Sequence, residues 1–159
     1  MTVSTEERYL IATNSTNLRV ESEKHGDGDV MIASGWAPNR IGSALMRLHT
    51  KPTRDNLYNV HMQVTIKAES MNIERPDSVA SAVIAWWLSR TCPVCFGRKY
   101  EVISSTPSLS AIECPRCHGS GEKKLPHGDV GRRLASWMDE CKHFHVGMIK
   151  SRLRNNQQG

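Results

Sequence analysis

The sequence predicts a mainly α-helical fold that carries one small β-hairpin. From residue 39 to residue 153, apolar residues recur mostly at helical spacing, and prolines or capping residues divide them into segments. Between residues 92 and 122 this pattern stops, and two Cys-x-x-Cys pairs enclose a stretch of alternating apolar and polar residues. We therefore expect a small helical domain with an inserted hairpin that resembles a zinc ribbon, with a knuckle at each Cys-x-x-Cys pair.

Two helices are expected before residue 72. The first can be capped by Asn39 and ends at Pro52, and the second can be capped by Thr53. The first has an apolar face formed by Ile41, Ala44, Leu45 and Leu48. The second has Leu57, Val60, His61, Val64, Ala68 and Met71 on one side. β-branched residues leave a strand as the alternative at 60–66, but the spacing favours a helix.

Two further helices flank the cysteine pairs. The third follows Pro76, with Asp77 or Ser78 as its cap. Its wide apolar face combines two rows of residues: Val79, Val83 and Trp87, and Ala80, Ile84 and Leu88. The last helix begins near Asp129 and is about 36 Å long unless Gly147 divides it. Its apolar side is Val130, Leu134, Trp137, Met138, Cys141, His145, Met148, Ile149 and Leu153.

These elements divide the chain into four parts. Residues 1–35 have no strong period and are expected to be a flexible N-terminal segment. Residues 36–91 form a helical region, and residues 92–122 form the hairpin. Residues 123–159 form a basic C-terminal helix that packs on the helical region.

Composition excludes several classes of protein. The chain has 159 residues, of which 38% are hydrophobic and 23% charged, so it is neither a disordered tail nor a membrane protein. No stretch approaches the roughly 18 apolar residues that cross a bilayer, and the N-terminus lacks the apolar core of a secretory signal. We expect a cytoplasmic protein, in which the five cysteines bind metal or remain thiols.

The positive charge lies at the C-terminal end. Residues 1–77 carry nine Lys/Arg against ten Asp/Glu, and residues 78–122 carry four against three, whereas residues 123–154 carry eight against three. A concentrated basic segment is typical of proteins that bind a polyanion, and a solvated helix face is the alternative. The candidates for phosphate contact are Lys123, Lys124, Arg132, Arg133, Lys142, Lys150, Arg152 and Arg154.

Four cysteines have the spacing of a structural zinc site. Cys92 and Cys95 form one pair, Cys114 and Cys117 form a second, and eighteen residues separate the two pairs. Each Cys-x-x-Cys turn places two thiolates on one side of a tight loop, and two turns supply the tetrahedral thiolate set that structural zinc prefers. Because no coordination position stays open, the expected single Zn²⁺ is structural. Buried free cysteines or a redox dithiol are the alternatives.

The residues around the pairs fit a hairpin with a metal-binding turn at each base. Residues 99–103 alternate, SSTPS forms a turn, and residues 109–112 return. Gly97 follows the first pair, and Gly119 and Gly121 follow the second. Glycine tolerates the positive φ angles that such turns need.

An enzyme is not predicted. The sequence contains no phosphate-binding loop, paired-carboxylate signature or nucleophile–base motif, and no small-molecule substrate is expected. Cys141 lies on the apolar face of the last helix and is expected to be a core thiol. His143 and His145 fall on different faces of that helix, so a second metal site is not expected.

The second Cys-x-x-Cys pair resembles the DnaJ-type cysteine-rich domains. Cys114 to Gly121 has their Cys-x-x-Cys-x-Gly-x-Gly pattern, whereas the first pair keeps only one of the two glycines. DnaJ proteins carry four such repeats and a His-Pro-Asp tripeptide. This chain has two repeats and no such tripeptide, so a complete co-chaperone is excluded.

Residues 57–153 resemble the Q antiterminator family of lambda-type bacteriophages more closely. Both have a helix entering the first pair, a hairpin, a Glu-Cys-x-Arg-Cys-x-Gly-x-Gly segment, a proline and helical C-terminal segments. The matching residues are Cys92, Cys95, Glu113, Cys114, Arg116, Cys117, Gly119, Gly121 and Pro126. Residues 133–153 resemble the family's final helix, and the segment between Pro126 and that helix is shorter here.

This resemblance implies a phage late-gene regulator acting in the host cytoplasm. Such a protein binds double-stranded DNA at the late promoter, associates with the host RNA polymerase and promotes read-through of terminators. The zinc-binding hairpin then fixes the geometry of the helices. One alternative is a DnaJ-like zinc module that binds proteins without nucleic acid, and another is a zinc scaffold that binds RNA. The basic C-terminal segment favours the two nucleic-acid interpretations.

Overall fold

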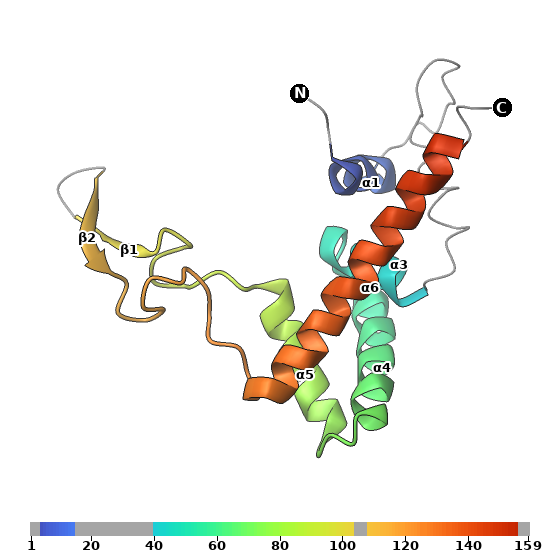
Figure 1. Ribbon diagram of the computed structural model, residues 1–159, viewed down its shortest axis with the longest axis horizontal. Helices are drawn as coiled ribbons and strands as arrows, with labels where there is room; N and C mark the ends of the chain where they lie inside the picture. Colours follow the sequence, from blue (N-terminus) through green and yellow to red (C-terminus); the bar gives the residue numbers. More distant parts are fainter. Residues whose placement is uncertain (1–3, 15–39, 104–107, 156–159) are drawn as a thin grey trace. The chain divides into compact units, whose positions relative to one another are not determined.

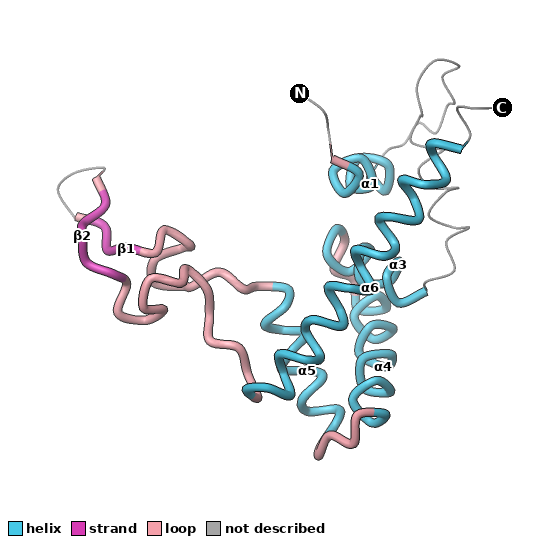
Figure 2. Tube along the Cα trace, in the orientation of Figure 1, coloured by secondary structure: helices cyan, strands magenta, loops and turns pink. Residues whose placement is uncertain are grey.

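A computed structural model describes residues 4–14, 40–103 and 108–155 of the chain (Figure 1). The described residues are mainly helical and include one two-stranded antiparallel sheet, which confirms the predicted combination of helices and a hairpin (Figure 2). The elements in chain order are α1 (Thr5–Asn14), α3 (Arg40–Thr50), α4 (Arg54–Ser70), α5 (Pro76–Leu88), β1 (Tyr100–Val102), β2 (Leu109–Glu113) and α6 (Gly128–Asn155).

The chain divides into two compact units. The first unit contains residues 1–64 and 136–159, and the second contains residues 65–135. The boundaries fall inside α4 and α6, so each unit includes part of both helices. The cysteine pairs and the hairpin belong to the second unit.

The first unit buries one face of α1 against α3 and the C-terminal part of α6. Its core cluster consists of Tyr9, Ala12, Met46, Val146, Ile149 and Leu153. At the start of α1, the Glu7 amide donates to Ser4 Oγ (3.1 Å) and the Ser4 amide donates to Glu7 Oε2 (2.8 Å), which is a capping box. The predicted absence of regular structure in residues 1–35 is therefore wrong for Thr5–Asn14. The rest of that segment lies outside the described residues.

The next two helices agree with their predicted caps and spacing. Thr53 Oγ1 accepts a hydrogen bond from the Asn56 amide (3.3 Å), so Thr53 caps α4 as predicted. Residues 60–66 are helical and not a strand. The buried positions recur at helical spacing and include Ala44, Leu45, Leu48, Val60, Val64 and Ala68.

Helix α5 begins earlier than the sequence suggested. Its N-cap is Arg75, with a φ of 51° and no side-chain cap, and Pro76 is the first helical residue. Proline suits this position because its missing N–H has no partner in the first turn in any case. The predicted caps Asp77 and Ser78 are therefore wrong. The predicted apolar face is correct, since the buried residues are Val79, Ala80, Val83, Ile84 and Trp87.

Helix α6 runs as one helix through Gly147 and has 28 residues. Its buried residues repeat every three to four positions, as expected from the sequence: Leu134, Met138, His145, Ile149 and Leu153. None of the described helices combines the length and the apolar character needed to cross a membrane.

Candidate metal centre

The cysteine pairs lie in a segment that is closed at its base by backbone pairing. Thr91 bridges Glu122, the Cys92 amide donates to the Gly121 carbonyl (2.9 Å), and the Lys123 amide donates to the Arg90 carbonyl (2.6 Å). The chain therefore enters and leaves the segment on adjacent antiparallel strands.

The hairpin extends between the two cysteine pairs. β1 and β2 are antiparallel, with Tyr100 opposite Glu113 and Val102 opposite Leu109. β2 carries two more residues than β1 between these pairs, so the register shifts there. The sheet is continued towards the metal site by the Cys114 amide, which donates to the Lys99 carbonyl (2.9 Å).

The two Cys-x-x-Cys turns have the same backbone structure, and we call them the first knuckle (residues 92–99) and the second knuckle (residues 114–121). In the first, the Phe96 amide donates to the Cys92 carbonyl (2.9 Å), and in the second the His118 amide donates to the Cys114 carbonyl (2.8 Å). A further bond repeats three residues on in each knuckle, as Arg98 to Cys95 (3.0 Å) and Ser120 to Cys117 (3.1 Å). The segment thus contains one turn twice.

Positive φ angles repeat at three equivalent positions of the knuckles. They occur at Phe96 and His118 (51° and 49°), Gly97 and Gly119 (80° and 75°), and Lys99 and Gly121 (72° and 79°). Lys99 therefore adopts the backbone of the glycine that the first knuckle lacks. The conformation is required by the turn, and glycine only makes it less costly.

The four predicted thiols meet at one point. The Sγ atoms of Cys92, Cys95, Cys114 and Cys117 all lie within 4.8 Å of one another, and those of Cys95 and Cys117 are 3.6 Å apart. Zinc–sulfur bonds of about 2.3 Å in a tetrahedron place the sulfurs about 3.8 Å apart. The Cys95–Cys117 sulfur distance of 3.6 Å is close to this value and too long for a disulfide, whose sulfurs are about 2.05 Å apart. The cluster can therefore hold one metal ion.

The surroundings of the cluster favour thiolates at two of its positions. Burial acts to raise the pKa of Cys117, but the Gly121 amide, which donates to its Sγ (3.2 Å), and the neighbouring thiols lower it to about 7. The Cys95 amide lowers the pKa of Cys92, whereas burial raises that of Cys95 itself. Thiolates bind soft metals, so part of the ligand set is already prepared for a metal ion.

The cluster offers a metal ion four thiol ligands. Within residues 4–14, 40–103 and 108–155, these cysteines are the one group of His, Cys, Asp or Glu side chains arranged for a metal ion. Four protein ligands fill a tetrahedral site, so a bound ion keeps no position for a substrate. His118 adjoins Cys117 but is exposed, and Cys141 lies outside the cluster and is partly buried.

A second set of contacts joins the segment to α5, and it was not predicted. Trp86 Nε1 donates to the Lys123 carbonyl (2.9 Å), and Lys123 Nζ donates to Ser89 Oγ (3.1 Å). The Arg90 guanidinium lies over the Trp86 ring, 4.7 Å from its centroid. Trp86 belongs to neither of the two apolar rows of α5. A tryptophan beside those rows is the sequence signal that it contacts another segment.

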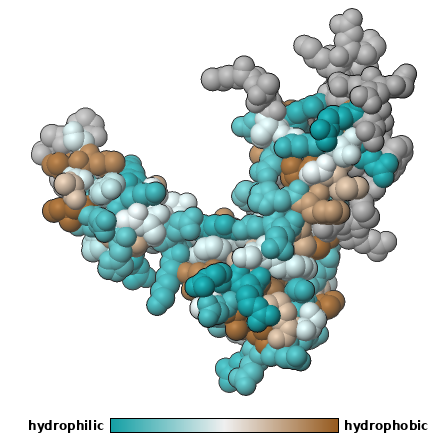
Figure 3. Space-filling view, in the orientation of Figure 1, coloured by the Kyte–Doolittle hydropathy of each residue, from teal (hydrophilic) through white to brown (hydrophobic). Residues whose placement is uncertain are grey.

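The two knuckles present different side chains on the same backbone. The first exposes Val94 and Phe96, whereas the second has Arg116 and His118 at the equivalent positions. The hairpin also exposes the apolar side chains of Ile103, Leu109 and Ile112, and Figure 3 shows hydrophobic side chains gathered over β1 and β2. The second knuckle is therefore the polar one.

The eight nominated basic residues are divided between the two units. Lys123, Lys124, Arg132 and Arg133 are exposed in the second unit, and Lys150, Arg152 and Arg154 are exposed in the first. Within the part of the chain that the structure describes, two of the eight form ion pairs: Lys142 with Glu6 (3.3 Å) and Arg132 with Asp129 (2.9 Å). The Lys142 side chain is only 15% exposed, so it is the least available of the set.

Comparisons of the chain with protein-family models, with curated proteins and with solved structures give no match. Functional inference therefore depends on the geometry described above and on the sequence resemblance.

Proposed function

We propose that this protein is a zinc-stabilised, DNA-binding regulator of transcription that acts with RNA polymerase as an antiterminator. The observation that carries the proposal is the positive charge around the cysteine cluster. Residues 90–133 contain eight Lys/Arg and four Asp/Glu. A zinc ion with four thiolates adds two negative charges, and the segment keeps a net positive charge even so.

Zinc is the metal that this donor set favours. Four thiolates at tetrahedral spacing suit Zn²⁺ or an iron–sulfur centre, whereas hard cations prefer oxygen ligands. Two Cys-x-x-Cys turns joined by a hairpin of about twenty residues are typical of structural zinc. The ion holds the two knuckles together and takes no part in a reaction.

A nucleic acid is the partner that the exposed charge favours, and the resemblance to phage antiterminators selects duplex DNA over RNA. Lysine and arginine side chains that contact phosphates release counterions, and this supplies affinity that does not depend on base sequence. The contribution of RNA polymerase and of terminator read-through rests on the resemblance of residues 57–153 to phage antiterminators. The side chains that read bases are not part of the proposal.

A salt-titrated binding assay tests the DNA-binding part. The zinc-loaded chain is titrated with labelled duplex and single-stranded oligonucleotides by fluorescence anisotropy at several salt concentrations. The proposal predicts that duplex binding weakens as a power of salt concentration and is tighter than binding to single strands of RNA or DNA. Absence of binding at low salt contradicts it, and tighter binding of RNA would favour the RNA scaffold.

The second candidate function is a DnaJ-like adaptor that binds proteins, and the exposed apolar side chains favour it. Val94, Phe96 and Ile112 are 56%, 69% and 63% exposed, near the metal centre or on the hairpin. A module that binds unfolded chains presents surfaces of this kind. It predicts suppression of aggregation of a reduced, unfolded client without any affinity for nucleic acid.

A further inference from the structure

A pocket lies where the second knuckle meets the strand that leaves the metal segment. Its volume is about 470 Å³, and its walls are Pro93, Arg116, Glu122, Lys123 and Lys124. Three of the five lining residues are cations. Arg116 comes from inside the second Cys-x-x-Cys pair, and the lysines follow that pair by several residues, so the sequence alone does not bring them together.

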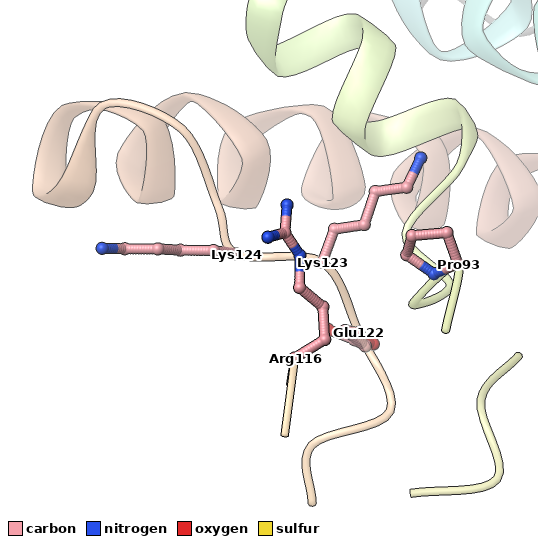
Figure 4. Close-up of a pocket in the computed structure, with 5 residues that line it drawn as sticks. All are labelled: Pro93, Arg116, Glu122, Lys123 and Lys124. Carbon is pink, nitrogen blue, oxygen red and sulfur yellow. The ribbon is translucent and has the colours of Figure 1, made fainter. Parts of the chain in front are cut away.

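Figure 4 shows the three cations of the pocket with their side chains extending in different directions. Arg116 extends from the second knuckle towards the backbone of Lys123 and Lys124. The Lys123 side chain turns towards Pro93 and the end of α5, and the Lys124 side chain extends in the opposite direction. Cations that diverge in this way fit neighbouring phosphates of one backbone better than a single phosphate.

Each wall of the pocket is held by a different part of the second unit. Arg116 stands between two cysteines of the cluster, so the metal ion fixes its backbone. Lys123 is held by Trp86 of α5 and by Ser89 and Arg90 just after it. The Lys123 amide, carbonyl and ammonium group pair with Arg90, Trp86 and Ser89 respectively. The pocket thus needs both the metal site and the contacts to α5.

The net charge of the pocket suits an extended anion that carries several negative groups. Glu122 offsets one of the three positive charges. The residual charge weakly attracts a small ion in water, whereas several neighbouring phosphates gain from each cation in turn. Arginine can bind a phosphate through two parallel hydrogen bonds, and lysine acts as a point charge.

We infer that this pocket is a binding site for the phosphodiester backbone of duplex DNA and that Arg116 and Lys124 each contact a phosphate there. The inference rests on the proposed DNA-binding function and locates a contact that the charge of the C-terminal segment does not specify. Lys123 also positions the wall of the pocket, because its carbonyl accepts a hydrogen bond from Trp86 of α5.

The test compares two double variants with the wild-type chain. Arg116→Gln/Lys124→Gln removes the two free cations of the pocket. Lys51→Gln/Arg54→Gln removes the same charge from exposed positions of the first unit that are not nominated for DNA contact. Both pairs are exposed, and zinc content and circular dichroism establish that each variant is folded and metal-loaded.

Duplex affinity is measured by anisotropy from about 50 mM to about 300 mM salt. Each lost contact is expected to lower affinity by about tenfold at the low end, and the two together reduce the slope of log K against log salt by about 1.8. The Lys51→Gln/Arg54→Gln chain should keep the wild-type slope. At concentrations at which an unlabelled duplex competes effectively, inorganic phosphate should not compete.

The outcomes separate the inference from the function on which it rests. An unchanged slope in Arg116→Gln/Lys124→Gln, with normal binding by the wild-type chain, overturns the pocket and leaves DNA binding standing. Equal losses in both double variants assign the effect to net charge and also overturn the pocket. Efficient competition by inorganic phosphate would show that the pocket binds a small free anion, and it would overturn the inference. No duplex binding by the wild-type chain overturns the proposed function itself.

Discussion

Lys99 and Gly121 occupy equivalent positions of the two knuckles, with φ angles of 72° and 79°. A side chain in this region of backbone space costs about 1 kcal/mol more than glycine does. At Gly121 there is also little room, because a Cβ atom would lie 3.1 Å from the Gly97 carbonyl oxygen. The same conformation therefore has a different tolerance in each knuckle.

This difference predicts opposite effects of two substitutions. Gly121→Ala should lower the free energy of unfolding by about 2 kcal/mol, because strain and crowding add. Lys99→Gly should raise it by up to about 1 kcal/mol, because it removes the strain. Urea unfolding of the zinc-loaded variants measures both, and a neutral Gly121→Ala variant would contradict the crowding described at Gly121.

His145 is a buried histidine that the metal centre does not use. It is fully buried in α6, and burial and the charge of Arg47 lower its pKa below the ordinary value of 6.5. As the pH falls below about 6.5, the unfolded chain takes up a proton at this histidine and the folded chain resists it. Stability is therefore retained above that pH and decreases below it.

A variant without the imidazole should lose this part of the pH dependence. The difference in unfolding free energy between pH 7 and pH 5, measured by denaturation, should be smaller for His145→Leu than for the wild type. His143→Gln is the matched control, because His143 is exposed on the same helix and should keep the wild-type difference. Equal pH dependence in all three chains would contradict the role of burial at His145.

At the scale of elements, two of the three glycines of α6, Gly131 and Gly147, have opposite surroundings. A Cβ at Gly131 would overlap the Pro126 carbonyl oxygen, because the chain turns tightly into the first turn of the helix. A Cβ at Gly147 would meet nothing within 4 Å. Gly131 allows the Pro126 carbonyl to lie close to the helix, whereas Gly147 only lowers the stability of the helix.

Alanine scanning of these two positions should therefore give opposite signs. Gly131→Ala should destabilise the fold by about 2 kcal/mol or more, because the overlap with backbone must be relieved by moving the chain. Gly147→Ala should stabilise it by about 0.5–1 kcal/mol through helix propensity. Thermal unfolding of the two variants measures this, and destabilisation by Gly147→Ala would contradict the open surroundings described for it.

The elements that sequence reasoning placed correctly are those with a clear apolar period. Helices α3 and α5 bury most of their predicted faces because packing and spacing act together there. Helix α4 buries Val60, Val64 and Ala68, but Leu57 of its predicted face is exposed. The helix α1 was missed although Ser4 and Glu7 form a recognisable capping box. Its apolar period is weak, and among residues 5–12 the buried ones are Tyr9 and Ala12. The start of α5 was misplaced because a proline can open a helix as well as end one.

At the scale of the whole molecule, the metal ligands were predictable from their spacing and Lys123 and Lys124 from their charge, but the pocket that these lysines form with Arg116 was not. Two thiolates on one turn must lie close together, so the Cys-x-x-Cys spacing specifies the cluster almost by itself. The pocket of Arg116, Lys123 and Lys124 depends on strand pairing at the base of the segment and on the Trp86 contact. These are long-range contacts, and charge counting along the chain carries no signal for them.

Removal of the metal should separate the two roles of the second unit. Chelation is expected to weaken the duplex binding and to lower its salt dependence, because Arg116 loses its fixed place beside the lysines. It should remove little of the helical signal in circular dichroism, since the described helices lie outside residues 92–122. Retention of wild-type duplex affinity in the metal-free chain would show that DNA binding does not depend on the cluster.

The central claim is that Cys92, Cys95, Cys114 and Cys117 hold one structural zinc ion. Zinc content per chain, measured by mass spectrometry of the purified full-length protein, tests it most directly. We predict about one zinc per chain in the wild type and in Cys141→Ser, which changes the cysteine outside the cluster, and much less in Cys114→Ser. A Cys114→Ser chain that keeps the full zinc content would contradict the claim.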